Sequence, residues 1–231
     1  KKFNYNKCIE LYKLFYTPNN IVLSIVSNLP FEKIKSFVKN SYFYKNTQAN
    51  NLSELIQINH YLQPRKTPTY QLIKKEGVSN NTVIVGFRVC GHDNNDKYTL
   101  HLLKNAIGNN MTGRLKYILR EEKGLVYSCY IDNEFFEKFG CFLFIAQTEF
   151  KNVIISSKEG VLPIMIQIIN DIIHKGITNQ ELTVAKGNIE GEVTHQLQNN
   201  SNQCIHNGEH VLLNPDKPFV SLKNSYKKNY K

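Results

Sequence analysis

LKNAIGNNMTGRLKYILREEKGLVYSCY, residues 103–130, predicts the end of one helix, a Gly/Asn-rich turn, a second helix, a glycine stop and a strand. The second helix is indicated by apolar residues at helical spacing from Met111 to Leu119. Gly124 is expected to end it, because glycine adopts the left-handed conformation at little cost. Residues 125–131 are β-branched and aromatic, a composition typical of a strand. This stretch therefore predicts a helix–glycine–strand turn.

The turn is expected to hold two polar side chains at a nearly fixed separation. Arg120 lies in the last turn of the predicted helix, and Tyr127 lies at the start of the predicted strand. Each has an ordinary structural explanation as well, since arginine near a helix C-terminus interacts favourably with the helix dipole and tyrosine is common in half-buried strands. The pair is therefore a candidate site that the rest of the chain has to support.

Outside this stretch the sequence predicts strand pairs joined by turns, with helices grouped in blocks. The expected elements are helices at residues 4–16, 31–40, 93–108 and 152–174, strands at 21–27, 70–75, 82–89 and 141–147, and a polar helix of about thirty residues after a capping box at 178–181. Pro163 predicts a kink or a break near the middle of the helix at 152–174. This order favours an α+β fold, with a mixed, largely antiparallel sheet and helices packed on one face.

The chain is expected to form a single domain over residues 1–231. Residues 1–40 supply an entry helix, strand and helix, residues 41–69 a crossing connection, and residues 70–231 the main sheet and helices. Because the chain opens Lys1-Lys2-Phe3 without an initiator methionine, we expect a fragment of a longer protein.

The composition is that of a globular protein with a basic bias. A formal net charge of +10 invites a nucleic-acid interpretation, but the lysines are spread along the whole chain. Nucleic acid is therefore the less favoured partner. The apolar runs are too short or too interrupted to predict a membrane span.

The five cysteines are odd in number and include no Cys-x-x-Cys pair, so neither a disulfide framework nor a cysteine zinc site is predicted. Cys129 and Cys204 are candidate nucleophiles only because histidines are also present, and buried, inert thiols are the favoured interpretation. A reducing intracellular compartment is expected.

One metal motif occurs near the C-terminal end. His206, Glu209 and His210 fit His-x-x-Glu-His, which on a helix places two zinc ligands and a general base together. Only Asp216 follows as an acidic third ligand, and Gly208 inside the helix costs about 1 kcal/mol relative to alanine. We interpret the match as a coincidence, so no metal site is predicted in this chain.

Several segments, in order, resemble the zinc peptidases that include pitrilysin, insulinase and the mitochondrial processing peptidase. The strongest match is Leu119-Arg120-Glu121-Glu122-Lys123-Gly124-Leu125-Val126-Tyr127-Ser128, against the family's L-R-E-x-x-G-L-x-Y. The other matching segments are residues 16–23 (YTPNNIVL), 105–115 (NAIGNNMTGRL), Gln147-Thr148 and 178–186 (TNQELTVAK). The resemblance covers nearly the whole chain and is to the second, C-terminal lobe, which does not bind zinc.

The resemblance implies an α+β lobe whose zinc motif belongs to a preceding lobe, in the same or a partner chain. Arg120 and Tyr127 match the family's arginine and tyrosine, which face the zinc across a closed chamber and hydrogen-bond a peptide near its scissile carbonyl. Asn109, Asn110 and Gly113 depart from the family's Gly-Gly and Ser. The expected function is that of the substrate-binding lobe of a zinc metalloendopeptidase acting on peptides or unfolded polypeptides, inactive by itself. The alternative is an inactive homologue with a structural or substrate-binding role.

Overall fold

The computed structural model describes two compact units of the chain. The described residues are 4–45 (without the Phe43 side chain), 67–73, 77, 79–108, 112–214 and 216–230. The units are Lys1–Gln63 with Gln196–Leu222, and Pro64–His195 with Lys223–Lys231. The prediction of one domain over residues 1–231 stays a prediction. Most of the expected connection at residues 41–69 lies outside the described residues.

A three-stranded antiparallel sheet is the centre of the second unit in the part of the chain that the structure describes. Its strands, in spatial order, are β1 (Asn81–Cys90), β3 (Phe139–Thr148) and β2 (Ser128–Phe135). The central strand β3 pairs with both neighbours, so that Ile145 lies opposite Ile84 on one side and Tyr130 on the other. The strands predicted at residues 82–89 and 141–147 are confirmed, and the one predicted at residues 125–131 begins later, at Ser128.

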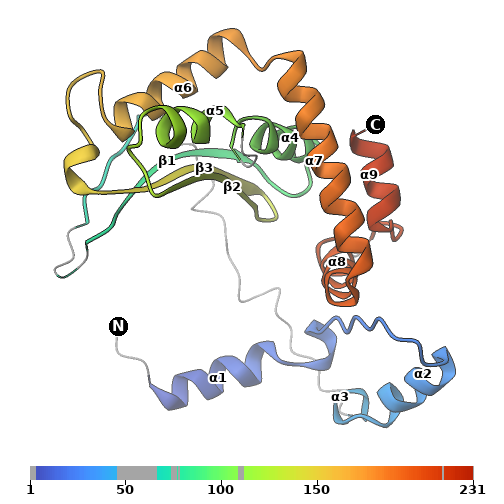
Figure 1. Ribbon diagram of the computed structural model, residues 1–231. Coiled ribbons are helices and arrows are strands. Elements are labelled where there is room, and N and C mark those ends of the chain that lie inside the picture. Colours follow the sequence, from blue (N-terminus) through green and yellow to red (C-terminus); the bar gives the residue numbers. More distant parts are fainter. Residues whose placement is uncertain are drawn as a thin grey trace. The chain divides into compact units, whose positions relative to one another are not determined.

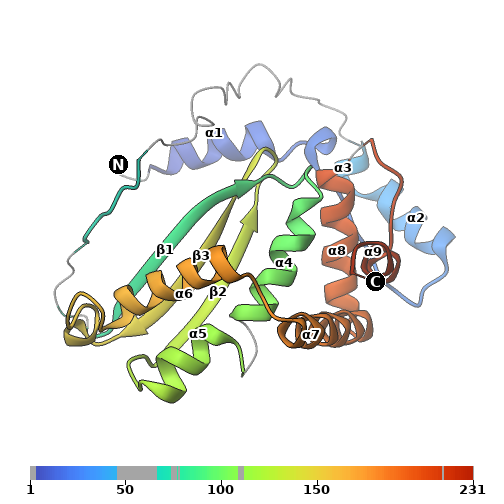
Figure 2. The same cartoon turned by 90° about the horizontal axis from the view of Figure 1, so that it is seen from above.

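Helices cover one face of this sheet. They are α4 (Asp96–Ile107), α5 (Arg114–Lys116) and α6 (Val161–Lys175), which lie above the strands in Figure 1 and on the viewer's side of the sheet in Figure 2. The predicted α+β class with helices on one face is therefore confirmed.

Alternation along the strands decides which side chains reach these helices. The buried strand residues include Val83, Cys129, Ile131, Phe142, Phe144 and Ala146. The helices supply Ala106, Ile107, Leu115, Leu119, Met165 and Ile168 to the same cluster. Because strand residues two apart share a face, Phe142, Phe144 and Ala146 of β3 all point into this core.

The α4 helix ends in close contact with the sheet. A Cβ atom built on Gly108 would lie 2.5 Å from Cγ1 of Ile131, which is fully buried. No larger residue fits at this position without movement of the helix or the strand. Gly108 therefore sets the distance between the end of α4 and strand β2.

The helix predicted at residues 152–174 is wrong in its start. After the short helix η4 (Phe150–Asn152) the chain forms a loop, and α6 begins only after Gly160, whose φ is 110°. Pro163 therefore lies in the first turn of α6, where its missing N–H has no helical partner to lose. The expected kink is therefore absent, and the break lies in the loop before Gly160 and not at Pro163 itself.

The predicted thirty-residue helix is two helices, α7 (Asn179–Gln198) and α8 (Asn200–Leu213). Asn199 interrupts them in an extended conformation, and its side-chain Oδ1 accepts hydrogen bonds from the backbone of Ser201 and Asn202 at 2.8 and 3.2 Å. An internal N-cap of this kind ends one helix and starts the next. A further helix, α9 (Leu222–Tyr230), was not expected from its lysine-rich sequence.

The strand predicted at residues 21–27 is wrong, and the one at 70–75 is not formed in its described part, residues 70–73. Both segments lack regular secondary structure, and the side chains of Leu23 and Tyr70 are 63% and 100% exposed. An apolar run indicates that a segment favours burial, but a strand also needs a neighbouring strand to hydrogen-bond with its backbone. The sequence alone does not reveal that neighbour.

The helices predicted at residues 4–16 and 31–40 are confirmed as α1 (Tyr5–Phe15) and α2 (Phe31–Asn40). The short helices η1 (Pro18–Asn20) and α3 (Tyr42–Lys45) were not predicted. None of the residues of α1 and α2 is fully buried. Across the residues that the structure describes, no helix combines the length and the apolarity needed to cross a membrane.

Arg114 joins three elements of the second unit. Its guanidinium donates to both carboxylate oxygens of Glu181, at 2.5 and 2.7 Å, and to the carbonyl oxygen of Gly176 at 2.8 Å. Glu181 also accepts from the backbone and hydroxyl of Thr178, at 2.7 and 3.0 Å, which confirms the predicted capping box at the start of α7. The fork geometry ties α5 to the turn between α6 and α7.

Replacing Arg114 is expected to destabilise the fold in a pH-dependent way. Arg114→Ala should lower the free energy of unfolding by about 1–3 kcal/mol at pH 7, because both partners are largely buried and Glu181 loses a charged donor. Arg114 holds the pKa of the Glu181 carboxyl below its ordinary 4.5. The stabilisation is therefore present above that value and is lost as the pH falls through the lowered pKa.

Urea denaturation at pH 7 and at pH 3 measures this difference. Lys123→Ala is the matched control, since Lys123 forms a half-exposed surface pair with Glu122 and should change stability by less than about 0.5 kcal/mol. Equal effects of the two substitutions at pH 7 would contradict a stabilising role for the Arg114–Glu181 pair.

Candidate functional site

The candidate site is the turn between α5 and β2. The helix that begins as α5 continues as the π-helical segment η3 (Tyr117–Glu122), and the N–H of Lys123 donates to the carbonyl of Ile118 at 3.1 Å. Such widened turns are rare and occur often at functional sites. Arg120 lies in this segment, as the sequence predicted.

Gly124 turns the chain from helix to strand. Its φ is +61°, in the left-handed region, and a Cβ atom placed there would meet nothing within 4 Å. Its N–H donates to the carbonyl of Arg120 at 3.1 Å, and the N–H of Leu125 donates to that of Leu119 at 2.9 Å. The predicted glycine stop is therefore confirmed. Glycine is needed at position 124 because the backbone there is in the left-handed region.

The far side of the turn is fixed to the end of β3. The carbonyl of Leu125 accepts from the hydroxyl of Thr148 at 2.5 Å and from the side-chain amide of Asn152 at 3.4 Å. Thr148 is fully buried, and the N–H of Tyr127 donates to the carbonyl of Gln147 at 2.9 Å. Both ends of the turn are thus held by hydrogen bonds, so its side chains project from a rigid backbone.

Arg120 presents its charge at the surface. Its side chain is about half exposed, and its Nε lies 3.9 Å from a carboxylate oxygen of Glu121. A contact of this length is at the limit of an ion pair and contributes little between exposed groups. The guanidinium can therefore exchange this neighbour for a carbonyl or carboxylate oxygen of a ligand at low cost.

Tyr127 has an acidic partner that the sequence did not reveal. Its side chain is 57% exposed, and its hydroxyl donates to Oε1 of Glu149 at 3.3 Å. The other oxygen of Glu149 lies 2.7 Å from Nζ of Lys151, and this contact lowers the pKa of the Glu149 carboxyl. Glu149 follows Gln147-Thr148 directly, so its place at the end of β3 is the signal that could have found it.

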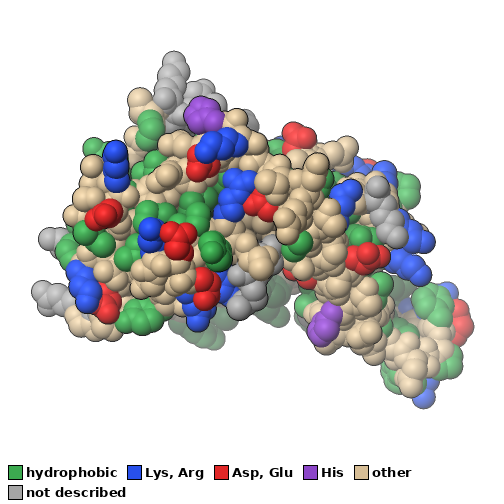
Figure 3. Space-filling model, turned by 45° about the horizontal axis from the view of Figure 1, so that its top comes forward, with side chains coloured by type: hydrophobic (Ala, Val, Ile, Leu, Met, Phe, Trp, Pro, Cys, Tyr) green, Lys and Arg blue, Asp and Glu red, His purple; other side chains and the backbone are tan. Residues whose placement is uncertain are grey.

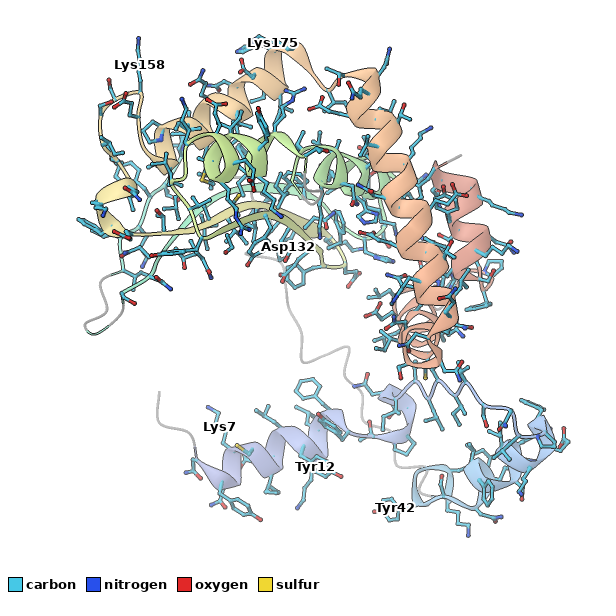
Figure 4. The ribbon with its side chains drawn as sticks, in the orientation of Figure 1. Lys7, Tyr12, Tyr42, Asp132, Lys158 and Lys175 are labelled. Carbon is cyan, nitrogen blue, oxygen red and sulfur yellow. The ribbon has the colours of Figure 1, made fainter. Side chains whose placement is uncertain are left out.

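A pocket of about 550 Å³ lies beside the same turn. Ile118, Leu125, Ile164 and Ile168 are among its apolar lining residues, and Glu122, Lys123, Lys158, Glu159 and Asp171 are its charged ones. In the space-filling view, hydrophobic side chains gather on the helical face with charged side chains around them (Figure 3). Lys158 projects from the loop that precedes α6 (Figure 4). The pocket can accept an apolar side chain with polar groups at its edge.

The residues that the structure describes include no group of three metal-ligating side chains. His206 and His210 lie on α8, and Glu209 beside them is exposed. The family's kind of zinc centre, with three protein ligands, therefore does not fit these residues.

The cysteines are free thiols with different environments. Burial raises the pKa of Cys129 to about 11, and its Sγ contacts the carbonyl of Leu115. Cys204 is half-buried and donates to the carbonyl of Ser24 at 2.9 Å, whereas Cys8 is exposed. The predicted burial is confirmed for Cys129, whereas Cys204, the other candidate, is only half-buried.

Comparison with known proteins shows the family to which the chain is similar. Residues 2–189 match the family model described as "Peptidase M16 inactive domain". An uncharacterized zinc protease of Bacillus subtilis, YmxG, is 25% identical over 213 residues, which are 91% of this chain and 48% of that protein. An uncharacterized zinc protease of Mycobacterium leprae is 23% identical over 80% of this chain and 40% of its own length. The chain thus spans about half the length of the curated relatives it matches.

Solved structures show the same fold. A protease from Helicobacter pylori superposes with a TM-score of 0.74 at 19% identity, covering 99% of this chain and 53% of that one. A peptidase M16 inactive domain from Pseudomonas fluorescens superposes with a TM-score of 0.56 at 21% identity, covering 67% of this chain and 35% of that one. At these identities the likeness concerns the fold.

A side chain at position 124 is expected to strain the backbone and destabilise the fold. Gly124→Ala should lower the free energy of unfolding by about 1–2 kcal/mol, because a non-glycine residue is strained in the left-handed region even where space is open. Gly187 of α7 is the matched control: its surroundings are also open, but it lies inside a helix. Gly187→Ala should stabilise the chain by about 0.5–1 kcal/mol. Thermal or urea unfolding measures both, and changes of the same sign would contradict this account.

The thiols are expected to differ in reactivity. At pH 8 a thiol with a pKa of about 11 is ionised to roughly one part in a thousand, and Cys129 is also buried. Iodoacetamide should therefore modify Cys8 in the folded chain within minutes and leave Cys129 intact, as mapped by mass spectrometry of tryptic peptides. Modification of both in denaturant is the control, and equal rates in the folded chain would contradict the burial of Cys129.

Proposed function

Because the chain belongs to the peptidase M16 inactive-domain family, we propose that it is the substrate-binding C-terminal lobe of a zinc metalloendopeptidase. The substrates are peptides or unfolded polypeptides, held between this lobe and a zinc-binding lobe. Relatives named as zinc proteases, about twice the length of this chain, support the proposal.

The zinc ion of the parent protein is bound by residues outside this chain. The described residues do not offer a group of three ligands, whereas a catalytic zinc usually has three protein ligands and one open position. When bound, such an ion polarises a carbonyl group and activates a water molecule. The zinc-binding lobe belongs to the same polypeptide or to a partner chain.

Arg120 is proposed to bind the substrate near the bond that is cleaved. The observation that carries this role is an exposed guanidinium on a turn whose backbone is fixed at Gly124 and Leu125. A cation that is positioned before the substrate arrives needs no reorganisation to stabilise negative charge that develops on a carbonyl oxygen. Its N–H groups can also donate to a backbone carbonyl of the bound peptide.

Tyr127 is proposed to donate a second hydrogen bond to the peptide. In the structure its hydroxyl donates to Glu149 over a long 3.3 Å, on the exposed side of the strand. A peptide carbonyl oxygen can replace this acceptor, because Lys151 continues to neutralise Glu149 at 2.7 Å. The Tyr127 phenol is thus a donor that changes its acceptor on substrate binding.

The pocket beside the turn supports a lobe that binds extended chains. Its apolar residues Ile118 and Leu125 belong to the same helix–glycine–strand turn as the two polar groups. A peptide whose backbone contacts Arg120 and Tyr127 can then place an apolar side chain in it.

The two polar side chains are expected to matter for turnover in the parent enzyme. Arg120→Ala and Tyr127→Phe should each lower kcat/KM for a quenched fluorescent peptide by about 10- to 1,000-fold, mostly through kcat, because their contacts strengthen as charge develops in the transition state. Lys138→Ala, which removes an exposed lysine of the β2–β3 turn outside the pocket lining, is the control and should leave kcat/KM within about twofold.

The 231-residue chain alone should not cleave the same peptide. Unchanged kcat in both Arg120→Ala and Tyr127→Phe would overturn the assigned roles. A parent protein that binds the peptide without cleaving it, even with Zn²⁺ supplied in excess, would instead establish the alternative of an inactive homologue with a structural or substrate-binding role.

A further inference from the structure

Helix α8 brings two histidines together one turn apart. His206 and His210 are four residues apart, a spacing that places side chains on the same face of a helix. Their ring centroids are 6.4 Å apart. The two histidines of the His-x-x-Glu-His motif therefore lie beside each other in the structure.

Each imidazole has a nitrogen that lacks a partner within the described part of the chain. Nε2 of His206 and Nδ1 of His210 are both buried, and neither makes a hydrogen bond. A buried polar atom of this kind costs about 1–3 kcal/mol unless something satisfies it. Two such atoms lie on adjacent turns of one helix, so a single bound group could satisfy both.

The other nitrogen of His206 shows which tautomer the ring adopts. Burial lowers the pKa of His206, and a hydrogen bond between its ring and the backbone of Val220 opposes this shift. A carbonyl can only accept, so the ring donates an N–H in this bond. Because Nε2 has no partner, Nδ1 is the donor, and the lone pair of the neutral ring lies on Nε2. Histidines that bind metals almost always have this arrangement, with the remaining N–H donated to a carbonyl or carboxylate.

We propose that His206 and His210 form a binding site for a divalent transition-metal ion such as Zn²⁺, with Nε2 of the first and Nδ1 of the second as ligands. The site is separate from the catalytic zinc of the parent protein and does not depend on the proposed function. Imidazole nitrogen is a preferred ligand of zinc, copper and nickel. One ion would satisfy both buried nitrogens at once.

The separation of the two rings is close to that of a chelate. With zinc–nitrogen bonds of about 2.0–2.1 Å and a tetrahedral angle, the ring centroids would lie about 1 Å closer together than the 6.4 Å of the structure, with both nitrogens turned toward one ion. Water completes the coordination, since the structure describes no third ligand in a group with these two. With Glu209 exposed on another face, the site lacks a general base and is structural.

The ion would stabilise α8 and the segment that follows it. A chelate between residues four apart links successive turns of the helix. The Val220 carbonyl is held by His206, and the ring of Phe219 packs edge-on against His210 with centroids 5.3 Å apart. Ordering both rings therefore also orders residues 219–220 against the helix.

A competition titration tests the site. The 231-residue chain, freed of metal with a chelator, is titrated with Zn²⁺ in the presence of a chromogenic zinc indicator. We expect one ion per chain, with affinity falling about tenfold or more in His206→Ala and in His210→Ala. Co²⁺ in place of Zn²⁺ should give a visible absorption band that both variants lose, a signature of direct ligation.

Matched variants separate this site from adventitious binding. His174→Ala and His195→Ala remove exposed histidines and should leave the affinity unchanged, as should Glu209→Gln. Circular dichroism of each metal-free variant confirms that α8 and its neighbours remain folded. Absence of stoichiometric Zn²⁺ binding to the unmodified chain, or an affinity in His206→Ala and His210→Ala as high as in the unmodified chain, would overturn the proposal.

Discussion

The burial of one face of β3 is the constraint on which the second unit depends. β3 is hydrogen-bonded on both edges, so its register positions β1 and β2 together. Phe142, Phe144 and Ala146 point from it into the helices, and a shift of one residue would turn all three to the opposite face. The packing of α4, α5 and α6 therefore fixes the register as much as the register fixes the packing.

The C-terminal end of β3 fixes the backbone of the candidate site. Thr148, the last residue of β3, is fully buried and bonds the carbonyl of Leu125. Gly124 can adopt its left-handed conformation because the bonds on both sides of it compensate for the entropy that ordering a glycine costs. The turn that carries Arg120 and Tyr127 is thus a consequence of the core and not a separate loop.

The local part of this architecture could be predicted from the sequence. The glycine stop at Gly124 and the capping box of α7 depend on neighbouring residues, and both are as expected. The start of α6 was not predictable, because Pro163 fits a first turn as well as a kink. The strand predicted at residues 21–27 was wrong for another reason, because strand formation depends on a partner strand that is distant in the sequence. Glu149 was missed because only the register brings it to Tyr127.

Arg114 and Arg120 show why residue type alone does not define a site. They lie six residues apart, in α5 and its π-helical continuation, and both match arginines of the family's motifs. Arg114 has its fork filled by Glu181 and the Gly176 carbonyl, so its charge serves the fold. Arg120 lies 3.9 Å from Glu121 with its side chain half exposed, so a ligand can compete for it. Residues six apart lie on different faces of a helix, so Arg120 does not share the face from which Arg114 reaches Glu181.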